Sequence, residues 1–376
     1  MRLLAPLAAL GLGAALLPVL SSAVTHAQDD KRASAPFEPK ACSTHVTPAP
    51  ANVADDPDLA PDVRKFLVEF NKDHPTPFFE LPQPKPQDVL TAWQNRTQVD
   101  MSGVTTTEHA LTVDGRTISL FVMKPDHVEG QPGIILFIHG GVWIVGDFEN
   151  HKRLLRDLVV ESGQPAVFVQ YTSLPAAKYP VQMNESYAAL EWTVAHASEF
   201  GADPSRIAVA GNSVGGDMTA ALNLMVKDRK GPKLSYQALL WPATNAAVDT
   251  CSYEQFANNR FLSQAFMKYG WDLYAPTGKE RDERYVSPLR ASLDELRGLP
   301  PTIVITDEND VLRDEGETYA HRLQDAGVPT VSTRYNGIIH DFGLLNGLAD
   351  LPTTKAMIRQ VAEASAPTLG RTIPLS

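Results

Sequence analysis

RIAVAGNSVGGDMTAAL, residues 206–222, is the stretch that decides the fold. An apolar run at 206–211 passes through a cluster of small residues into a pattern typical of a helix. Ser213 lies at the transition, inside the pattern Gly-x-Ser-x-Gly formed with Gly211 and Gly215. Glycines on both sides remove the Cβ atoms that would collide in so tight a turn, and the serine hydroxyl can then stand exposed above a helix N-terminus. A serine that only caps a glycine-rich turn is the alternative, but the strand-turn-helix context favours a nucleophile.

Other short runs have the same apolar composition as residues 206–211, and helical patterns separate them. They are GIILFIH (133–139), AVFVQY (166–171), YQALLW (236–241) and PTIVIT (301–306). Strands buried on both faces have this composition, so we expect an α/β fold: a mostly parallel central sheet with helices on both faces. HALTVDGRTISLFVMKP (109–125) alternates apolar and polar residues around Asp114-Gly115, which predicts an antiparallel hairpin at one edge.

The first 27 residues have the pattern of a secretory signal peptide. One basic residue, Arg2, precedes an apolar run at 3–20, and small residues lead to Ala27. An uncleaved membrane anchor is the alternative, because the run is longer than is usual for a signal. We expect export to the periplasm or the medium, with no stable membrane insertion after cleavage.

Residues 28–55 are rich in Pro, Ala and Asp without periodicity, which predicts a flexible N-terminal arm before a domain at 56–376. The chain contains two cysteines, Cys42 and Cys251. In an exported protein an even pair favours a disulfide, here one that ties the arm to the domain. Two unrelated free thiols are the alternative.

Charge and motifs exclude several classes of function. The 376 residues carry a formal net charge of −11 and no basic cluster, so neither nucleic acid nor an anionic membrane surface is an expected partner. HExxH, CxxC and GxGxxG are all absent from the sequence. We therefore expect no metal and no organic cofactor.

A nucleophilic serine needs a base and an acid that orients the base. His340 follows the last alternating strand, whereas His139 precedes the serine and is better suited to bracing its own glycine loop. After the strand PTIVIT, five carboxylates compete for the role of the acid: Asp307, Glu308, Asp310, Asp314 and Glu315. The chain order Ser, Asp, His is that of the α/β-hydrolase sheet.

Four motifs together carry a family resemblance: HGGVW (139–143), GNSVGG (211–216), DVLRDEG (310–316) and GIIHDF (337–342). With SPL (287–289) and KYP (178–180), they resemble the hormone-sensitive-lipase-like family of α/β-hydrolase esterases over about residues 57–365. The resemblance implies Asp310 as the acid and His340 as the base. It also implies an oxyanion hole made by the backbone N–H groups of Gly141, Val142 and Val214.

Three positions depart from the family pattern without removing a catalytic group. Val142 replaces a glycine or alanine, and a β-branched residue tolerates a positive φ badly and would narrow the floor of the site. Asn212 replaces the aspartate beside the nucleophile, and Val311 replaces the proline after the acid. We expect these changes to affect the shape of the substrate more than the reaction.

The resemblance implies a helical cap, formed by about 56–98 and about 248–290, that roofs the serine. Phe261, Phe266 and Trp271 of the cap, with Trp143, are the expected pocket residues. The alternative for the aromatic stripe that includes Phe261, Phe266 and Trp271 is packing of its helix onto the sheet, which we expect for some of its residues. The implied function is hydrolysis of small, short-chain acyl esters through an acyl-enzyme. An amidase, lactonase or peptidase on the same scaffold is the alternative, and a non-catalytic binding protein of this fold is a remote one.

Overall fold

The computed structural model describes residues 33–82, 84–128, 130–366 and 368–370. The predicted signal peptide at 1–27 lies outside the described residues. Within the described part, no helix is both long and apolar enough to cross a membrane.

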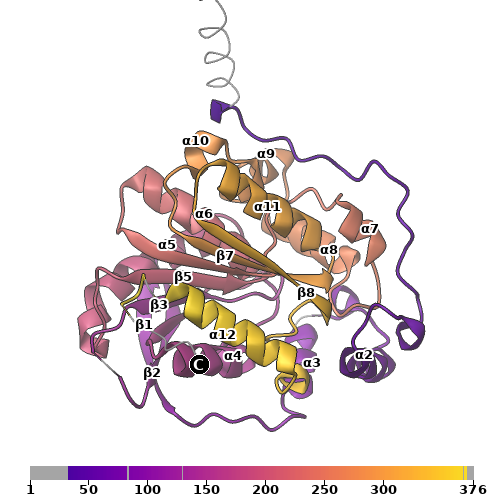
Figure 1. Cartoon of the computed structure of the whole chain (residues 1–376), viewed down its shortest axis with the longest axis horizontal. Coiled ribbons are helices and arrows are strands. Elements are labelled where there is room, and N and C mark those ends of the chain that lie inside the picture. The colour runs from indigo at the N-terminus through magenta and orange to yellow at the C-terminus, as the bar shows by residue number, and fades with distance from the viewer. Residues whose placement is uncertain (1–32, 83, 129, 367, 371–376) are drawn as a thin grey trace, which may run out of the picture.

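An eight-stranded sheet forms the centre of the protein, in the order β1-β2-β4-β3-β5-β6-β7-β8 (Figure 1). β3 to β8 pair in parallel, and only the β1–β2 and β2–β4 pairs are antiparallel. The strands are β1 Val104–Val113, β2 Arg116–Pro125, β3 Ile134–Ile138, β4 Ala166–Gln170, β5 Ile207–Asn212, β6 Leu234–Leu240, β7 Thr302–Asn309 and β8 Thr330–Ile339. The predicted mostly parallel sheet is therefore confirmed.

The edge hairpin also forms as predicted. Val113 pairs with Arg116, and Asp114 and Gly115 between them have φ values of 48° and 78°. Two consecutive positive φ values define the type I′ turn that Asp-Gly favours, because its twist matches that of the flanking strands. The hairpin covers one edge of the sheet, and the parallel strands that carry the chemistry lie further in.

Helices cover both faces of the sheet because successive residues of a buried strand point to opposite sides. Leu136 of β3 packs with α5 and α6, whereas its neighbour Phe137 packs with α4 and α12. The longer helices are α2 Pro61–Asp73, α3 Lys85–Gln94, α4 Phe148–Ser162, α5 Val181–His196, α6 Val214–Arg229, α8 Gln264–Tyr274, α11 Arg313–Asp325 and α12 Pro352–Ser365. The short helices are α7 Cys251–Gln255, α9 Gly278–Arg281 and α10 Leu293–Leu296.

Two segments from distant parts of the chain meet through a cluster of phenylalanines. Phe70 of α2 and Phe78 contribute rings from the first segment, and Phe261 and Phe266 contribute rings from the second. The centroids of Phe70 and Phe261 are 5.2 Å apart, and those of Phe78 and Phe266 are 5.8 Å apart. Both segments lie within the ranges expected for the cap, about 56–98 and about 248–290, and we call these two ranges together the cap.

The N-terminal arm lies along the surface in an extended conformation, with no helix or strand between residues 36 and 51 (Figure 1). Cys42 forms a disulfide with Cys251 at the start of α7, the pairing favoured by the sequence. Further along, the carboxylate of Asp56 pairs with the guanidinium of Arg260 in the cap, and both side chains are buried. The arm is thus held by the disulfide and by backbone hydrogen bonds such as Ala49 N–H to Gln255 O, and the buried ion pair fixes the residue that follows the arm.

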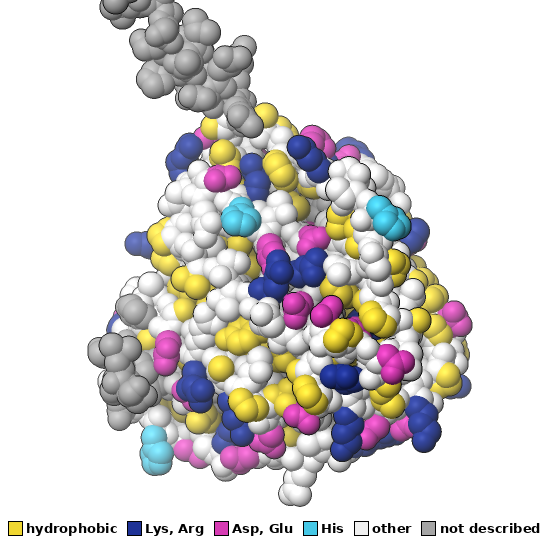
Figure 2. Space-filling view, turned by 45° about the vertical axis from the view of Figure 1, so that its right-hand side comes forward, with side chains coloured by type: hydrophobic (Ala, Val, Ile, Leu, Met, Phe, Trp, Pro, Cys, Tyr) yellow, Lys and Arg dark blue, Asp and Glu magenta, His cyan; other side chains and the backbone are white. Residues whose placement is uncertain are grey.

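Figure 2 shows the surface of the molecule after the right-hand side of Figure 1, along which the arm runs, has been turned toward the viewer. Lysine, arginine, aspartate and glutamate side chains are interspersed there, and apolar side chains are scattered between them. This face therefore has no concentration of positive charge suited to a polyanion.

Candidate active site

Ser213 stands at the junction of β5 and α6, in a strained conformation with φ 56° and ψ −126°. The flanking glycines are required by close backbone contacts. A Cβ on Gly211 would lie 2.3 Å from the carbonyl oxygen of Gly215, and a Cβ on Gly215 would lie 2.1 Å from that of Ile138. The turn therefore admits no larger residue at either position, and strain of this kind is typical of functional sites.

His340 lies between Ser213 and Asp310 and contacts both. Its Nε2 is 3.0 Å from Ser213 Oγ, and its Nδ1 is 2.7 Å from Asp310 Oδ2. Asp310 is itself fixed, because its Oδ1 accepts the backbone N–H of Leu312 at 3.0 Å. The structure thus brings together the three side chains that the sequence analysis assigned as nucleophile, base and acid, in hydrogen-bond order.

The electrostatic surroundings of His340 favour its protonated form. Complete burial alone would lower the pKa of the imidazole, but the negative charges of Asp310 and Asp341 outweigh burial and raise that pKa above its usual value. The raised pKa makes the neutral imidazole a stronger base toward the proton of a hydroxyl, and the imidazolium that forms can give this proton to a leaving group.

The backbone N–H groups of Gly141, Val142 and Val214 are available to an anion beside Ser213. None of the three has an acceptor among the described residues. Val214 is the first residue of α6, where the helix leaves its N–H groups unpaired. Gly141 and Val142 line the same cavity as Ser213. This placement suits the stabilisation of an oxyanion.

Asn212 links the two loops that flank the serine, a role that the sequence did not reveal. Its side-chain oxygen accepts the N–H of Gly140 at 3.0 Å, and its amide nitrogen donates to Asp341 Oδ1 at 3.0 Å. Trp241 Nε1 donates to the same carboxylate oxygen at 2.7 Å. An ionised aspartate at position 212 could not donate a hydrogen bond to Asp341. The asparagine that replaces the family's aspartate is therefore suited to a neighbouring carboxylate. The turn HDF was the only sequence signal for Asp341.

The cavity above Ser213 is small and apolar. It has a volume of about 20 Å³, room for roughly one water molecule. Phe78, Phe261 and Phe266 roof it from the cap, and Val142 lines it from the oxyanion loop. Phe261 and Phe266 therefore stand where the sequence analysis expected pocket residues.

Trp143 and Trp271 do not line this cavity, although both were expected in the substrate pocket. They are fully buried and pack edge to face, with ring centroids 4.6 Å apart. Tyr274 also stacks on Trp143, with ring centroids 3.9 Å apart. The aromatic residues of α8 thus have different surroundings. Phe266 lines the cavity with Ser213, whereas Trp271 packs against Trp143.

Asp307, the competing candidate for the acid, has no hydrogen bond to His340. Its side chain is fully buried, and neither carboxylate oxygen has a partner among the described residues. Burial, together with the charges of Asp310 and Asp341, raises the pKa of the Asp307 carboxyl well above its usual range. Burial therefore favours the neutral form of Asp307, whereas the acid beside an imidazolium must be ionised.

Asp307, Asp310 and His340 also bring donor atoms within 4.8 Å of one another, a spacing that could hold a metal ion. However, a metal bridging His340 and Asp310 would need about 2.0–2.2 Å to each donor atom. The two donor atoms are already joined at 2.7 Å by a hydrogen bond. In this arrangement the two atoms are therefore each other's partners.

His139 contacts the loop that follows β3, and its Nε2 has no partner among the described residues. Its Nδ1 is 2.7 Å from the carbonyl oxygen of Gly140, and its ring stacks on Tyr171 at 4.0 Å. Burial, followed by the neighbouring His151, lowers the pKa of His139 to about 3. The bracing role expected from the sequence fits these contacts.

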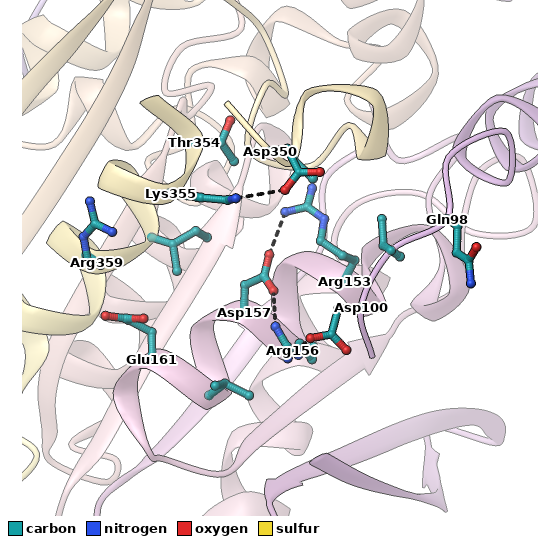
Figure 3. A pocket seen from close by; sticks show the side chains of 14 residues that line it. Gln98, Asp100, Arg153, Arg156, Asp157, Glu161, Asp350, Thr354, Lys355 and Arg359 are labelled. Atoms are coloured by element: carbon teal, nitrogen blue, oxygen red, sulfur yellow. Dashed lines mark hydrogen bonds and ion pairs between the residues drawn. The ribbon is translucent and has the colours of Figure 1, made fainter. Parts of the chain in front are cut away.

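A larger groove, of about 430 Å³, lies between α4 and α12 (Figure 3). Ion pairs lie along each wall: on α4, Arg153 and Arg156 both contact Asp157, and on the α12 side Lys355 contacts Asp350. None of the catalytic candidates lines it. The buried Arg153 nevertheless donates to the carbonyl oxygen of Gly343 at 2.6 Å, so the groove wall anchors the segment that follows His340.

This sheet, with a serine at the turn after β5 and a histidine after β8, defines an α/β hydrolase. Residues 135–344 match the sequence profile of a family described as having the alpha/beta hydrolase fold. The chain belongs to this family, in its hormone-sensitive-lipase-like group.

Relatives of known name agree with this assignment. A thermostable esterase from Pseudomonas putida has a similar crystal structure, with a TM-score of 0.82 and 45% sequence identity over 84% of this chain and 99% of that one. The carboxylesterase NlhH of Mycobacterium tuberculosis is 33% identical over 238 residues, which are 62% of this chain and 74% of NlhH. An arylesterase of Saccharolobus solfataricus is 35% identical over 211 residues, 56% of this chain and 68% of the arylesterase.

Proposed function

We propose that this protein is a carboxylesterase that hydrolyses small esters through an acyl-enzyme on Ser213. The observation that carries the proposal is the hydrogen-bonded series from Ser213 Oγ to His340 at 3.0 Å and from His340 to Asp310 at 2.7 Å. The relatives named as esterases support an ester over other acyl compounds.

In the first half-reaction, Ser213 Oγ attacks the acyl carbon while His340 Nε2 takes the hydroxyl proton. The resulting oxyanion accepts hydrogen bonds from the N–H groups of Gly141, Val142 and Val214. Asp310 holds Nδ1–H of the imidazole and stabilises the imidazolium. His340 then gives its proton to the departing alcohol. In the second half-reaction, water attacks the acyl-enzyme by the same route and releases the carboxylic acid.

The roof of the cavity supports a preference for short acyl chains. About 20 Å³ is less than any ester occupies, so Phe78, Phe261 and Phe266 must move to admit a substrate. Each methylene that fits contributes up to ~0.8 kcal/mol, and each that does not fit contributes nothing. We expect kcat/KM to be highest for acetyl to hexanoyl esters and to fall steeply beyond about octanoyl.

Export is a separate part of the proposal. It rests on the signal pattern in residues 1–27 and is supported by the disulfide between Cys42 and Cys251, a bond that persists in oxidising compartments. N-terminal sequencing of the protein recovered from the periplasm or the medium tests it. An intact N-terminus on membrane-bound protein would favour the anchor instead.

A p-nitrophenyl ester series from acetate to palmitate tests the activity, with Ser213→Ala as the control. A fluorophosphonate probe should label the wild type once per chain and leave Ser213→Ala unlabelled. The matching p-nitroanilides and lactones decide between an esterase and the other acyl hydrolases. A wild type that binds esters without turnover would point to a binding protein.

A further inference from the structure

Two consecutive residues of the oxyanion loop adopt a backbone conformation that their side chains disfavour. Val142 has φ 55° and Trp143 has φ 57°, in the left-handed region where a β-branched residue is an outlier. Such conformations persist only where the surroundings hold them. The N–H of Val142 is one of the proposed oxyanion donors, so whatever holds this conformation also aims that donor.

Both side chains pack against one helix of the cap, α8. Val142 fits against Gly270: a Cβ added to Gly270 would lie 2.1 Å from Val142 Cγ1 and 3.5 Å from its Cβ. Trp143 stacks on Tyr274 with an interplanar angle of 7° and meets Trp271 edge to face. Gly270, Trp271 and Tyr274 belong to the buried face of α8. The contact is therefore continuous over two residues of the loop and more than one turn of the helix.

We propose that α8 positions the oxyanion donors, so that the oxyanion hole is assembled only while the cap is docked. The proposal rests on the proposed function and concerns how the same site is controlled. Gly270 is the key residue, because only a residue without a side chain leaves room for the valine that this chain has in place of a small residue. Val142 and Gly270 act as positioning residues, since they bear on the reaction through the backbone of the loop.

The proposed coupling links access to the cavity above Ser213 with the conformation of the oxyanion loop. A substrate reaches Ser213 only when the roof residues Phe261 and Phe266 move, and Phe266 is itself part of α8. Displacing α8 withdraws the support of Val142 and Trp143, and the loop is then free to relax. Closure of the cap over a bound ester restores the contact and the donors together, which is an induced-fit arrangement.

Gly270→Ala, Val142→Ala and the double variant test the coupling as a cycle. Gly270→Ala should lower kcat for p-nitrophenyl butyrate by about 100-fold with a much smaller change in KM, since the lost interaction belongs to the transition state. Val142→Ala removes the clashing Cγ1, so the double variant should recover kcat to within about twofold of Val142→Ala alone. Gly278→Ala is the matched control, because Gly278 starts α9 with no atom within 4 Å of an added Cβ.

Hydrogen exchange of the amides at 140–146 gives a readout that does not depend on ester turnover. Exchange there should be faster in Gly270→Ala and return to the Val142→Ala level in the double variant. Tyr274→Leu, which adds no bulk, should accelerate the same amides even if Gly270→Ala does not fold. Unchanged exchange and unchanged kcat in Gly270→Ala, or a double variant no better than Gly270→Ala, would overturn the coupling. Loss of the proposed function would appear separately, as a wild type without turnover or fluorophosphonate labelling.

Discussion

Asp310→Asn is the substitution that most directly tests the proposed mechanism. In the wild type, Asp310 Oδ1 accepts the N–H of Leu312 and Oδ2 accepts Nδ1–H of His340. An asparagine can satisfy Leu312 only by keeping its oxygen at the first position, which turns its NH₂ group toward His340. Nδ1 must then become an acceptor, and the imidazole proton moves to Nε2. That nitrogen faces Ser213 and can no longer take the hydroxyl proton.

The expected loss is about 10⁴ in kcat, the size found when a triad aspartate is replaced isosterically. It corresponds to roughly 5 kcal/mol of transition-state stabilisation. Initial rates with p-nitrophenyl butyrate, normalised by active-site titration, measure it. Asp307→Asn is the matched control: it is equally buried and three residues away but has no bond to His340, so kcat should change less than about tenfold. The reasoning is refuted if Asp310→Asn stays within tenfold of the wild type, or if Asp307→Asn loses more.

Three further predictions concern pH and stability. Because the charge of Asp341 helps to raise the pKa of His340, the acid limb of kcat/KM should have its midpoint above 6.5, and Asp341→Asn should move it to lower pH; an unmoved limb would contradict this. The raised pKa of Asp307 means that the folded protein retains a proton that the unfolded chain loses above about pH 4. As the pH rises from there, the free energy of unfolding of the wild type should therefore fall relative to that of Asp307→Asn by up to about 1.4 kcal/mol per pH unit. Urea unfolding at a series of pH values measures this, and an equal pH dependence in the two proteins would show an ionised Asp307 instead. Replacing Cys42 and Cys251 with serine opens a loop of 209 residues and should cost about 5 kcal/mol on the chain-entropy account, whereas an unchanged urea midpoint would exclude a stabilising disulfide.

The sheet could be predicted from the sequence because each parallel strand is buried on both faces and is therefore apolar throughout. The turn around Ser213 was predictable for the same kind of reason, since a local geometry demanded glycine at two fixed positions. The acid was harder to assign: spacing left five carboxylates open, family resemblance pointed to Asp310, and the bond to His340 distinguishes it from Asp307.

Contacts between distant segments carried no sequence signal. Asn212 meets Asp341 across 129 positions, and no local periodicity encodes such a pair. The aromatic residues of α8 were expected to face the substrate together, yet Phe266 faces the cavity while Trp271 packs on Trp143. A helical stripe specifies which residues are buried, but the partner on the other side decides what each of them does.

The buried ion pair between Asp56 and Arg260 determines where the polypeptide can be shortened. Arg260 is 1% exposed, and two of its three guanidinium nitrogens have no partner among the described residues, so Asp56 is its only counter-charge there. A truncated protein that starts after residue 56 would leave this charge uncompensated inside the cap, at a cost of about 3–5 kcal/mol. Removing the first 30 residues leaves the pair intact. The boundary of the smallest folded unit therefore lies before Asp56, although no residue of the sheet or the active site has been reached at that point.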